Sequence, residues 1–170
     1  MNNTNENLML LDILKEAISI EIYGMEYYSI FSELVEDENA KAIFKGLARD
    51  EAEHRSLLEN EYKKTAGKPV ELRELDEENR NKARRVFPES MEPMGIGETR
   101  DVLTLGIRTE KRSIELYSTG AEKIDNKSSK ELFLTLVYFE EGHKKTLEDA
   151  LYYLEQEGSW YGYSPPTIEG

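Results

Sequence analysis

The 170-residue sequence contains no cysteine and only two histidines, His54 and His143. Disulfide bonds, thiolate zinc sites and cysteine-ligated iron–sulfur clusters are therefore excluded. No apolar run approaches the roughly 18–20 residues that a membrane-spanning helix needs. The first seven residues also lack the basic and apolar regions of a secretory signal. Together these absences predict a soluble, cytoplasmic protein.

Positive charge is scarce as well, with 22 lysines and arginines against 35 aspartates and glutamates, which gives a net charge of −13. Nucleic-acid binding depends on neutralising phosphates with Lys and Arg, so this balance argues against it. The same negative field favours the accumulation of cations. The five prolines lie only between the two halves and at the end of the chain. A Glu-, Lys- and Leu-rich chain of this kind favours long helices.

Apolar residues with heptad-like spacing predict four helices, at about residues 6–36, 39–64, 98–123 and 128–157. The midpoints of the two predicted hairpins fall beside Asp37 and at Asp125–Asn126. A long connection, residues 65–97, carries several Gly and Pro and has room for a short helix at about 76–85. We therefore expect an all-α four-helix bundle of two hairpins joined by a long crossover connection. Residues 1–157 form this domain, and residues 158–170 form a non-helical tail rich in aromatic residues and proline.

The two halves of the chain repeat each other at an offset of 89 residues. The stripe Phe-Leu-Glu-His-Leu is identical in the second and fourth predicted helices. In each half a single glutamate precedes a Glu-x-x-His by 30 residues. The repeated polar residues are Glu21, Glu51 and His54 in the first half, and Glu110, Glu140 and His143 in the second.

These residue types at this spacing predict a dinuclear metal site. Residues i and i+3 share one face of a helix, so each Glu-x-x-His directs a carboxylate and an imidazole to one point. A carboxylate can bridge two metals, and four glutamates balance two divalent ions. Burying six such groups without a metal costs several kcal/mol for each uncompensated charge. Carboxylate and imidazole ligands suit iron and manganese, and zinc would bind without redox activity. A degenerate or mononuclear site remains the alternative.

Other repeated residues surround these ligands. Tyr28 and Tyr117 lie two turns beyond the single glutamates, where they either hydrogen-bond ligand carboxylates or serve as core aromatics. Small residues one turn on either side of the single glutamates leave room for an oxidant or allow close helix approach: Ala17, Gly24, Gly106 and Ser113. Four further glutamates point away from the ligand face: Glu26 and Glu115 are expected at the surface or in an interface, and Glu53 and Glu141 are expected as solvated surface charges.

The paired motif resembles the ferritin-like di-iron superfamily and, within it, the rubrerythrin-like family, over residues 8–155. The resemblance implies that Glu51 and Glu140 bridge two irons, with His54 and His143 each on one metal. Glu21 and Glu110 match the terminal ligands. It also implies a di-iron cofactor, for which manganese or a mixed iron–manganese pair are substitutes. Peroxide or dioxygen would be the oxidant, and a homodimer is expected. The candidate catalytic residues are Glu21, Glu110, Tyr28 and Tyr117.

The sequence departs from rubrerythrins at two points. Full-length rubrerythrins carry a rubredoxin-like domain with iron on four cysteines, and this chain has no cysteine, so a separate protein would donate electrons. Rubrerythrins also place an extra glutamate three residues after the ligand of the third helix, where this chain has Ser113. The symmetric ligand set looks as much like a ferroxidase centre. Three functions stay open: peroxide reduction, iron oxidation and handling, and a structural helical protein that retains a metal site.

Overall fold

The computed structural model describes residues 2–72 and 99–157, together with Leu75, Glu78, Asn81 and Val86. Its long helices are α1 (Asn2–Leu34), α2 (Glu38–Ala66), α4 (Thr99–Lys123) and α5 (Lys127–Glu157). No strand occurs within the described ranges. The predicted all-α class is confirmed, and each predicted helix matches an observed one to within a few residues.

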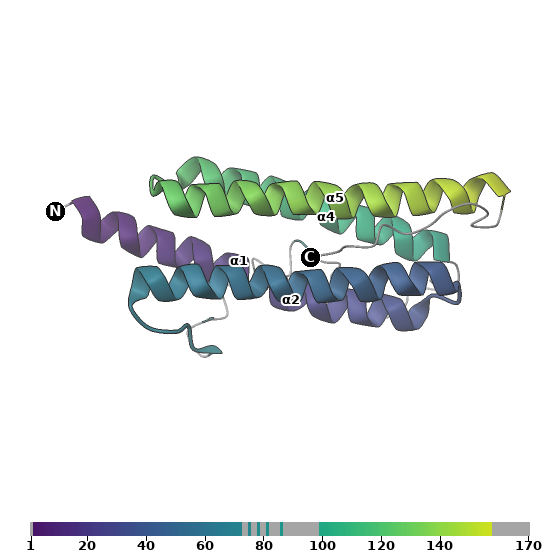
Figure 1. The fold of residues 1–170 in the computed structure, drawn as a ribbon, viewed down its shortest axis with the longest axis horizontal. Coiled ribbons are helices and arrows are strands. Elements are labelled where there is room, and N and C mark those ends of the chain that lie inside the picture. The colour runs from purple at the N-terminus through teal and green to yellow at the C-terminus, as the bar shows by residue number, and fades with distance from the viewer. Residues whose placement is uncertain are drawn as a thin grey trace.

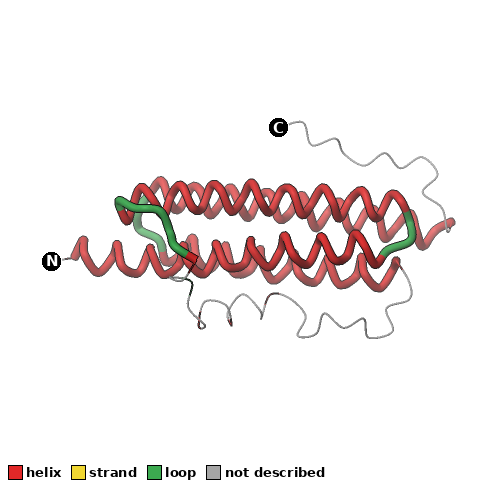
Figure 2. Tube along the Cα trace, turned by 90° about the horizontal axis from the view of Figure 1, so that it is seen from below, coloured by secondary structure: helices red, strands yellow, loops and turns green. Residues whose placement is uncertain are grey.

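The four helices form an elongated bundle of two hairpins (Figure 1). In it α1 packs against α2 and α4, and α5 packs against α4 and α2. The α1–α2 turn and the α4–α5 turn lie at opposite ends of the bundle, as the loops in Figure 2 show. Helices α2 and α4 therefore run in the same direction. The connection between them must return along most of the roughly 40 Å length of α2, which is the crossover that the sequence predicted.

The ends of the helices follow from local sequence. Asp37 is the N-cap of α2, and its carboxylate accepts hydrogen bonds from the backbone N–H groups of Asn39 and Ala40. Gly67 ends α2 in the left-handed conformation with φ of 73°, and its N–H donates to the carbonyl of Lys63. The side chain of Asn126 accepts from the backbone N–H of Ser129 at the start of α5. Both predicted turns therefore contain a residue whose side chain caps the helix that follows.

The repeated stripes face the interior of the bundle, and their large side chains are almost fully buried. Tyr28 packs over Phe44, with ring centroids 6.0 Å apart. Their counterparts at the offset of 89, Tyr117 and Phe133, meet edge to face at 5.9 Å. Two equivalent aromatic layers thus lie on either side of the middle of the core, where the polar residues of the stripes sit. Val86, from the long connection, is also buried, and its carbonyl accepts a hydrogen bond from Arg112 of α4.

Two sequence predictions concern segments that the structure mostly leaves undescribed. Most of the short helix expected at residues 76–85, and the whole tail at 158–170, lie outside the described residues. The division into a bundle at 1–157 and a tail at 158–170 therefore stays a prediction. Among the helices that are described, none has the length and apolar character needed to cross a membrane.

Candidate metal centre

All six repeated polar side chains meet at the middle of the bundle. Each helix contributes one or two of these side chains from near its own midpoint. The six residues are only 1% to 6% exposed. Ligand atoms of four residues lie within 4.8 Å of one another in each of two overlapping groups. One group is Glu21, Glu51, His54 and Glu140, and the other is Glu51, Glu110, Glu140 and His143. Because both groups include Glu51 and Glu140, these two carboxylates lie between the others.

The two histidines present the same ring nitrogen to the cluster. Nδ1 of His54 lies 3.0 Å from Glu51, 3.2 Å from Glu140 and 3.8 Å from Glu21. Nδ1 of His143 lies 3.3 Å from Glu140, 3.6 Å from Glu51 and 3.9 Å from Glu110. The imidazole rings are nearly parallel, with centroids 5.4 Å apart. Each histidine thus faces both shared glutamates and the single glutamate of its own half.

The two tyrosines connect the hairpins. The Tyr28 hydroxyl donates a short hydrogen bond to Glu110, and the Tyr117 hydroxyl donates one to Glu21. Each tyrosine therefore holds the single glutamate of the opposite half. The sequence left a hydrogen-bonding role and a core role open, and the structure shows both at once, since the rings are buried in the aromatic layers.

Burial and mutual repulsion divide the acids of the cluster into two kinds. Burial raises the pKa of Glu21 and of Glu110 well above the ordinary value, and the charges of the shared glutamates add to the effect. For Glu51 and Glu140 burial acts in the same direction, but the close contacts with the two histidines outweigh it and lower the pKa of both. The environment of the cluster therefore favours the ionised form of the shared pair and the protonated form of the single glutamates.

The histidines show the complementary effect. Burial lowers the pKa of His54, but the facing carboxylates of Glu140 and Glu51 raise it to about 9. Burial also lowers the pKa of His143, and the facing carboxylates of Asp50, Glu140 and Glu51 raise it well above its ordinary value. In the absence of a metal, the carboxylates therefore favour the protonated form of both histidines.

The donor atoms of the cluster fit a pair of metal ions. Glu110 Oε2, Glu140 Oε1 and His143 Nδ1 are buried and lack a hydrogen-bond partner. Such orphaned groups each cost about 1–3 kcal/mol, and a cation at the centre of the cluster would satisfy all three. Oxygen donors with one imidazole nitrogen in each group suit iron or manganese. The chemistry of the donor set therefore agrees with the site expected from the sequence.

Close packing explains the small residues beside the single glutamates. A Cβ added at Gly24 would lie 3.1 Å from Cγ of Glu51, so glycine lets α1 approach that carboxylate. A Cβ at Gly106 would lie 3.0 Å from Leu147 and 3.3 Å from Phe44. Of the two sequence interpretations, these contacts favour close helix approach. The four glutamates expected at the surface are all exposed.

Two neighbours of the cluster were not identified from the sequence. Asp50 of α2 is buried, and its Oδ2 lies 3.4 Å from Nε2 of His143. Phe139 of α5 stacks on His54, with ring centroids 5.1 Å apart and planes 9° from parallel. Both residues directly precede the glutamate of a Glu-x-x-His and occupy the same position at the offset of 89. The residue type at this position differs between the two halves, and this departure from the repeat was the sequence feature that could have identified both residues.

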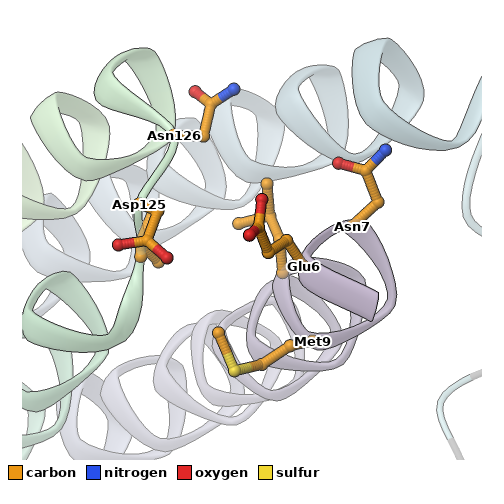
Figure 3. A pocket seen from close by; sticks show the side chains of 7 residues that line it. Glu6, Asn7, Met9, Asp125 and Asn126 are labelled. Carbon is orange, nitrogen blue, oxygen red and sulfur yellow. The ribbon is translucent and has the colours of Figure 1, made fainter. Parts of the chain in front are cut away.

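A separate pocket lies at the end of the bundle where α1 begins. Residues near the start of α1 and in the α4–α5 turn line it, among them Glu6, Met9 and Asp125 (Figure 3). The six clustered residues lie near the midpoints of their helices and none of them lines this pocket. It is therefore distinct from the metal centre.

Known proteins agree with this geometry. The rubrerythrin family model matches residues 12–96, which are 85 of the 170 residues and thus half of the chain. The bacterioferritin-related protein of Bacteroides fragilis, described as a dodecameric thioferritin, is 19% identical with a TM-score of 0.73, and 92% of each chain is covered. A hypothetical protein from Pyrococcus furiosus is 22% identical with a TM-score of 0.63, covering 86% of this chain and 90% of that one.

At such identities the two structures establish the fold alone. A search of curated proteins finds no match. The family match and the shared fold lead to one conclusion: the chain belongs to the rubrerythrin family of ferritin-like di-iron proteins.

Proposed function

We propose that this protein is a non-haem di-iron oxidoreductase that reacts with hydrogen peroxide or dioxygen. The observation that carries the proposal is the pair of four-residue groups that share Glu51 and Glu140 at the buried centre of the bundle. This arrangement has the symmetry of a bridged pair of ions, with one terminal glutamate and one histidine for each. The family to which the chain belongs uses such centres for redox chemistry.

In this proposal Glu51 and Glu140 would be shared by the two metals. Glu21 and His54 would complete one site, and Glu110 and His143 would complete the other. The four carboxylates carry a charge of −4, which balances two divalent cations. Iron is the proposed metal, and manganese fits the same donors. When bound, the iron pair supplies two electrons to the oxidant.

The protein's own residues supply position, charge and protection from water. The hydroxyls of Tyr28 and Tyr117 hold the terminal glutamates in place. Burial, reinforced by the neighbouring carboxylates, raises the pKa of both tyrosines well above the ordinary value, so they remain hydrogen-bond donors at neutral pH. Core aromatics on either side exclude bulk water from the reacting centre.

Turnover with peroxide needs two electrons and two protons for each peroxide reduced to two waters. A di-iron centre held by these residues would store the electrons for one such reduction, after which a donor would have to restore them. The 170 residues contain no cysteine, and therefore they cannot form an iron site of the rubredoxin type. We therefore propose a separate electron-donor protein.

A second candidate function is the oxidation and handling of iron itself, with ferrous iron as substrate and ferric iron as product. The observation that favours it is the buried Ser113 at the position where rubrerythrins place an extra glutamate. The symmetric ligand set that results resembles a ferroxidase centre. A metal-binding protein with a structural role only would bind ions without oxidising them.

Anaerobic loading with ferrous iron, followed by stopped-flow mixing with peroxide or dioxygen, tests the proposal. We expect two irons per chain, oxidised much faster by peroxide if the protein is a peroxide reductase. Comparable or faster oxidation by dioxygen, with release or accumulation of ferric iron, would favour iron handling. A chain that binds iron but reacts with neither oxidant would contradict both redox proposals.

Ligand variants with a matched control test the assignment of residues. Glu51→Ala and His54→Ala should weaken or abolish the binding of two metals. Glu53→Ala, on the same helix but exposed, should bind them as the wild type does. Tight binding of two ions by the ligand variants would show that the assignment is wrong.

We also propose that the protein forms oligomers, with a homodimer as the simplest. The Bacteroides fragilis thioferritin is described as dodecameric, so a larger assembly is the alternative. Several large apolar side chains are exposed on α5, including Leu134, Tyr138 and Tyr152. Light scattering coupled to size-exclusion chromatography distinguishes a monomer, a dimer and a dodecamer.

A further inference from the structure

The cluster is symmetric in its six proposed ligands and asymmetric immediately outside them. Positions related by the offset of 89 make reciprocal contacts, as the two tyrosine–glutamate hydrogen bonds show. Asp50 and Phe139 also occupy related positions, and each contacts the histidine of the opposite half. One contact brings a negative charge to a histidine, and the other brings an aromatic ring.

The contact of Asp50 lies on the far side of the His143 ring from the cluster. Nδ1 of His143 faces the shared glutamates, while Nε2 faces Oδ2 of Asp50 at 3.4 Å. If Nδ1 binds a metal, the neutral ring carries its proton on Nε2 and directs it at this carboxylate. The distance is longer than an ordinary N–H···O hydrogen bond, but Oδ2 is buried and has no hydrogen-bond partner of its own.

The other oxygen of Asp50 lies 3.6 Å from Nε of Arg49, whose side chain is 61% exposed. Solvent screens an exposed guanidinium strongly, so it offsets little of the charge that Asp50 presents to the buried ring. His54 has no comparable partner at the related position, because the ring of Phe139 cannot accept a hydrogen bond. The environments of the two histidines therefore differ by one buried carboxylate.

We propose that Asp50 makes the two metal positions inequivalent, so that the position with Glu110 and His143 binds a divalent cation first and more tightly. Asp50 acts as a positioning residue: it accepts the Nε2 proton, holds the ring orientation and makes Nδ1 a stronger donor. The position with Glu21 and His54 fills second. This inference rests on the proposed function, since it requires a dinuclear centre.

Titration of the metal-free full-length protein with Co²⁺, followed by calorimetry and visible absorption, tests the inference. Two cations repel each other across shared carboxylates, so two binding steps would appear even in a symmetric site. The decisive observation is which of the two histidines must be present for the first cation to bind tightly. We expect His54→Ala to keep the tight first step and His143→Ala to lose it. Equal losses in the two variants would overturn the inference.

Two further variants separate positioning from a purely structural role. Asp50→Asn should weaken the first step by about 10- to 100-fold, the usual effect of losing a partner of a metal-bound histidine, and leave the second unchanged. Phe139→Asp, which restores the repeat, should tighten the second step, whereas Phe139→Leu should not. A residue with only a structural role would not produce this gain. Asp50→Asn weakening both steps equally, or neither, would refute the positioning role.

The outcomes distinguish this inference from the proposed function. Two ions bound by the wild type with no preference between the histidines would refute the asymmetry and leave the dinuclear centre standing. Fewer than two ions bound at saturating Co²⁺ would refute both. Circular dichroism of each metal-free variant confirms that a change in binding does not come from loss of helix.

Discussion

Removal of the metal should make the stability of this protein fall as the pH rises. The metal-free cluster holds protons that the unfolded chain does not. The pKa of His54 is raised from 6.5 to about 9 by the facing carboxylates of Glu140 and Glu51, against the opposing effect of burial. Between these two values the folded state keeps a proton that the unfolded state has lost. The free energy of unfolding therefore decreases through this window.

The size of this decrease in the free energy of unfolding follows from the difference between the folded-state and unfolded-state pKa of His54. Each unit corresponds to about 1.4 kcal/mol, so His54 alone contributes about 3 kcal/mol below pH 6.5 that is lost by about pH 9. Glu21 and Glu110 act in the same direction, because their raised pKa values favour the folded state only while they stay protonated. The lowered pKa values of Glu51 and Glu140 also stabilise the folded state. This stabilisation is complete above about pH 5, so it does not change between pH 6.5 and 9.

Urea denaturation of the metal-free protein at several pH values between 6.5 and 9, followed by circular dichroism, measures the effect. His54→Gln should remove about 3 kcal/mol of the decline, since it deletes the titrating group. The metal-loaded protein should behave in the opposite way, because metal binding needs deprotonated ligands and strengthens as the pH rises. Stability of the metal-free protein that stays constant or rises over this range would refute the reasoning.

Two further predictions concern packing and hydrogen bonding. Tyr28→Phe removes the hydrogen-bond donor to the buried Glu110 and should destabilise the metal-free protein by about 1–3 kcal/mol, measured by urea denaturation. The same substitution should weaken metal binding, and an unchanged metal affinity would contradict the role of Tyr28 in holding the ligand. Gly120→Ala would place a Cβ 2.9 Å from the buried Phe133 ring and should lower stability by about 1–3 kcal/mol. Its control, Gly46→Ala, meets no atom within 4 Å and should raise stability by about 0.5–1 kcal/mol; equal shifts in the two melting temperatures would contradict this packing argument.

The sequence by itself determined the helices, the two hairpins and the six residues that meet in the core. Helical periodicity is local, so a glutamate in a stripe of leucines and phenylalanines must face the interior wherever the helix packs. In each hairpin the single glutamate and the Glu-x-x-His lie at equal distances from the predicted turn, which predicted that they lie at the same height. The chain's membership of the rubrerythrin family followed from the same residues.

Only the tertiary structure decided how the two hairpins contact each other. That Tyr28 bonds Glu110, and not the glutamate of its own helix, depends on the packing of α1 against α4. The meeting of Asp50 with His143 likewise depends on the packing of α2 against α5. A periodic pattern specifies which face of a helix is buried, but not which residue of another helix lies opposite, because that follows from the position and angle at which the helices pack. The asymmetry around the two histidines therefore emerged only when the four helices were assembled.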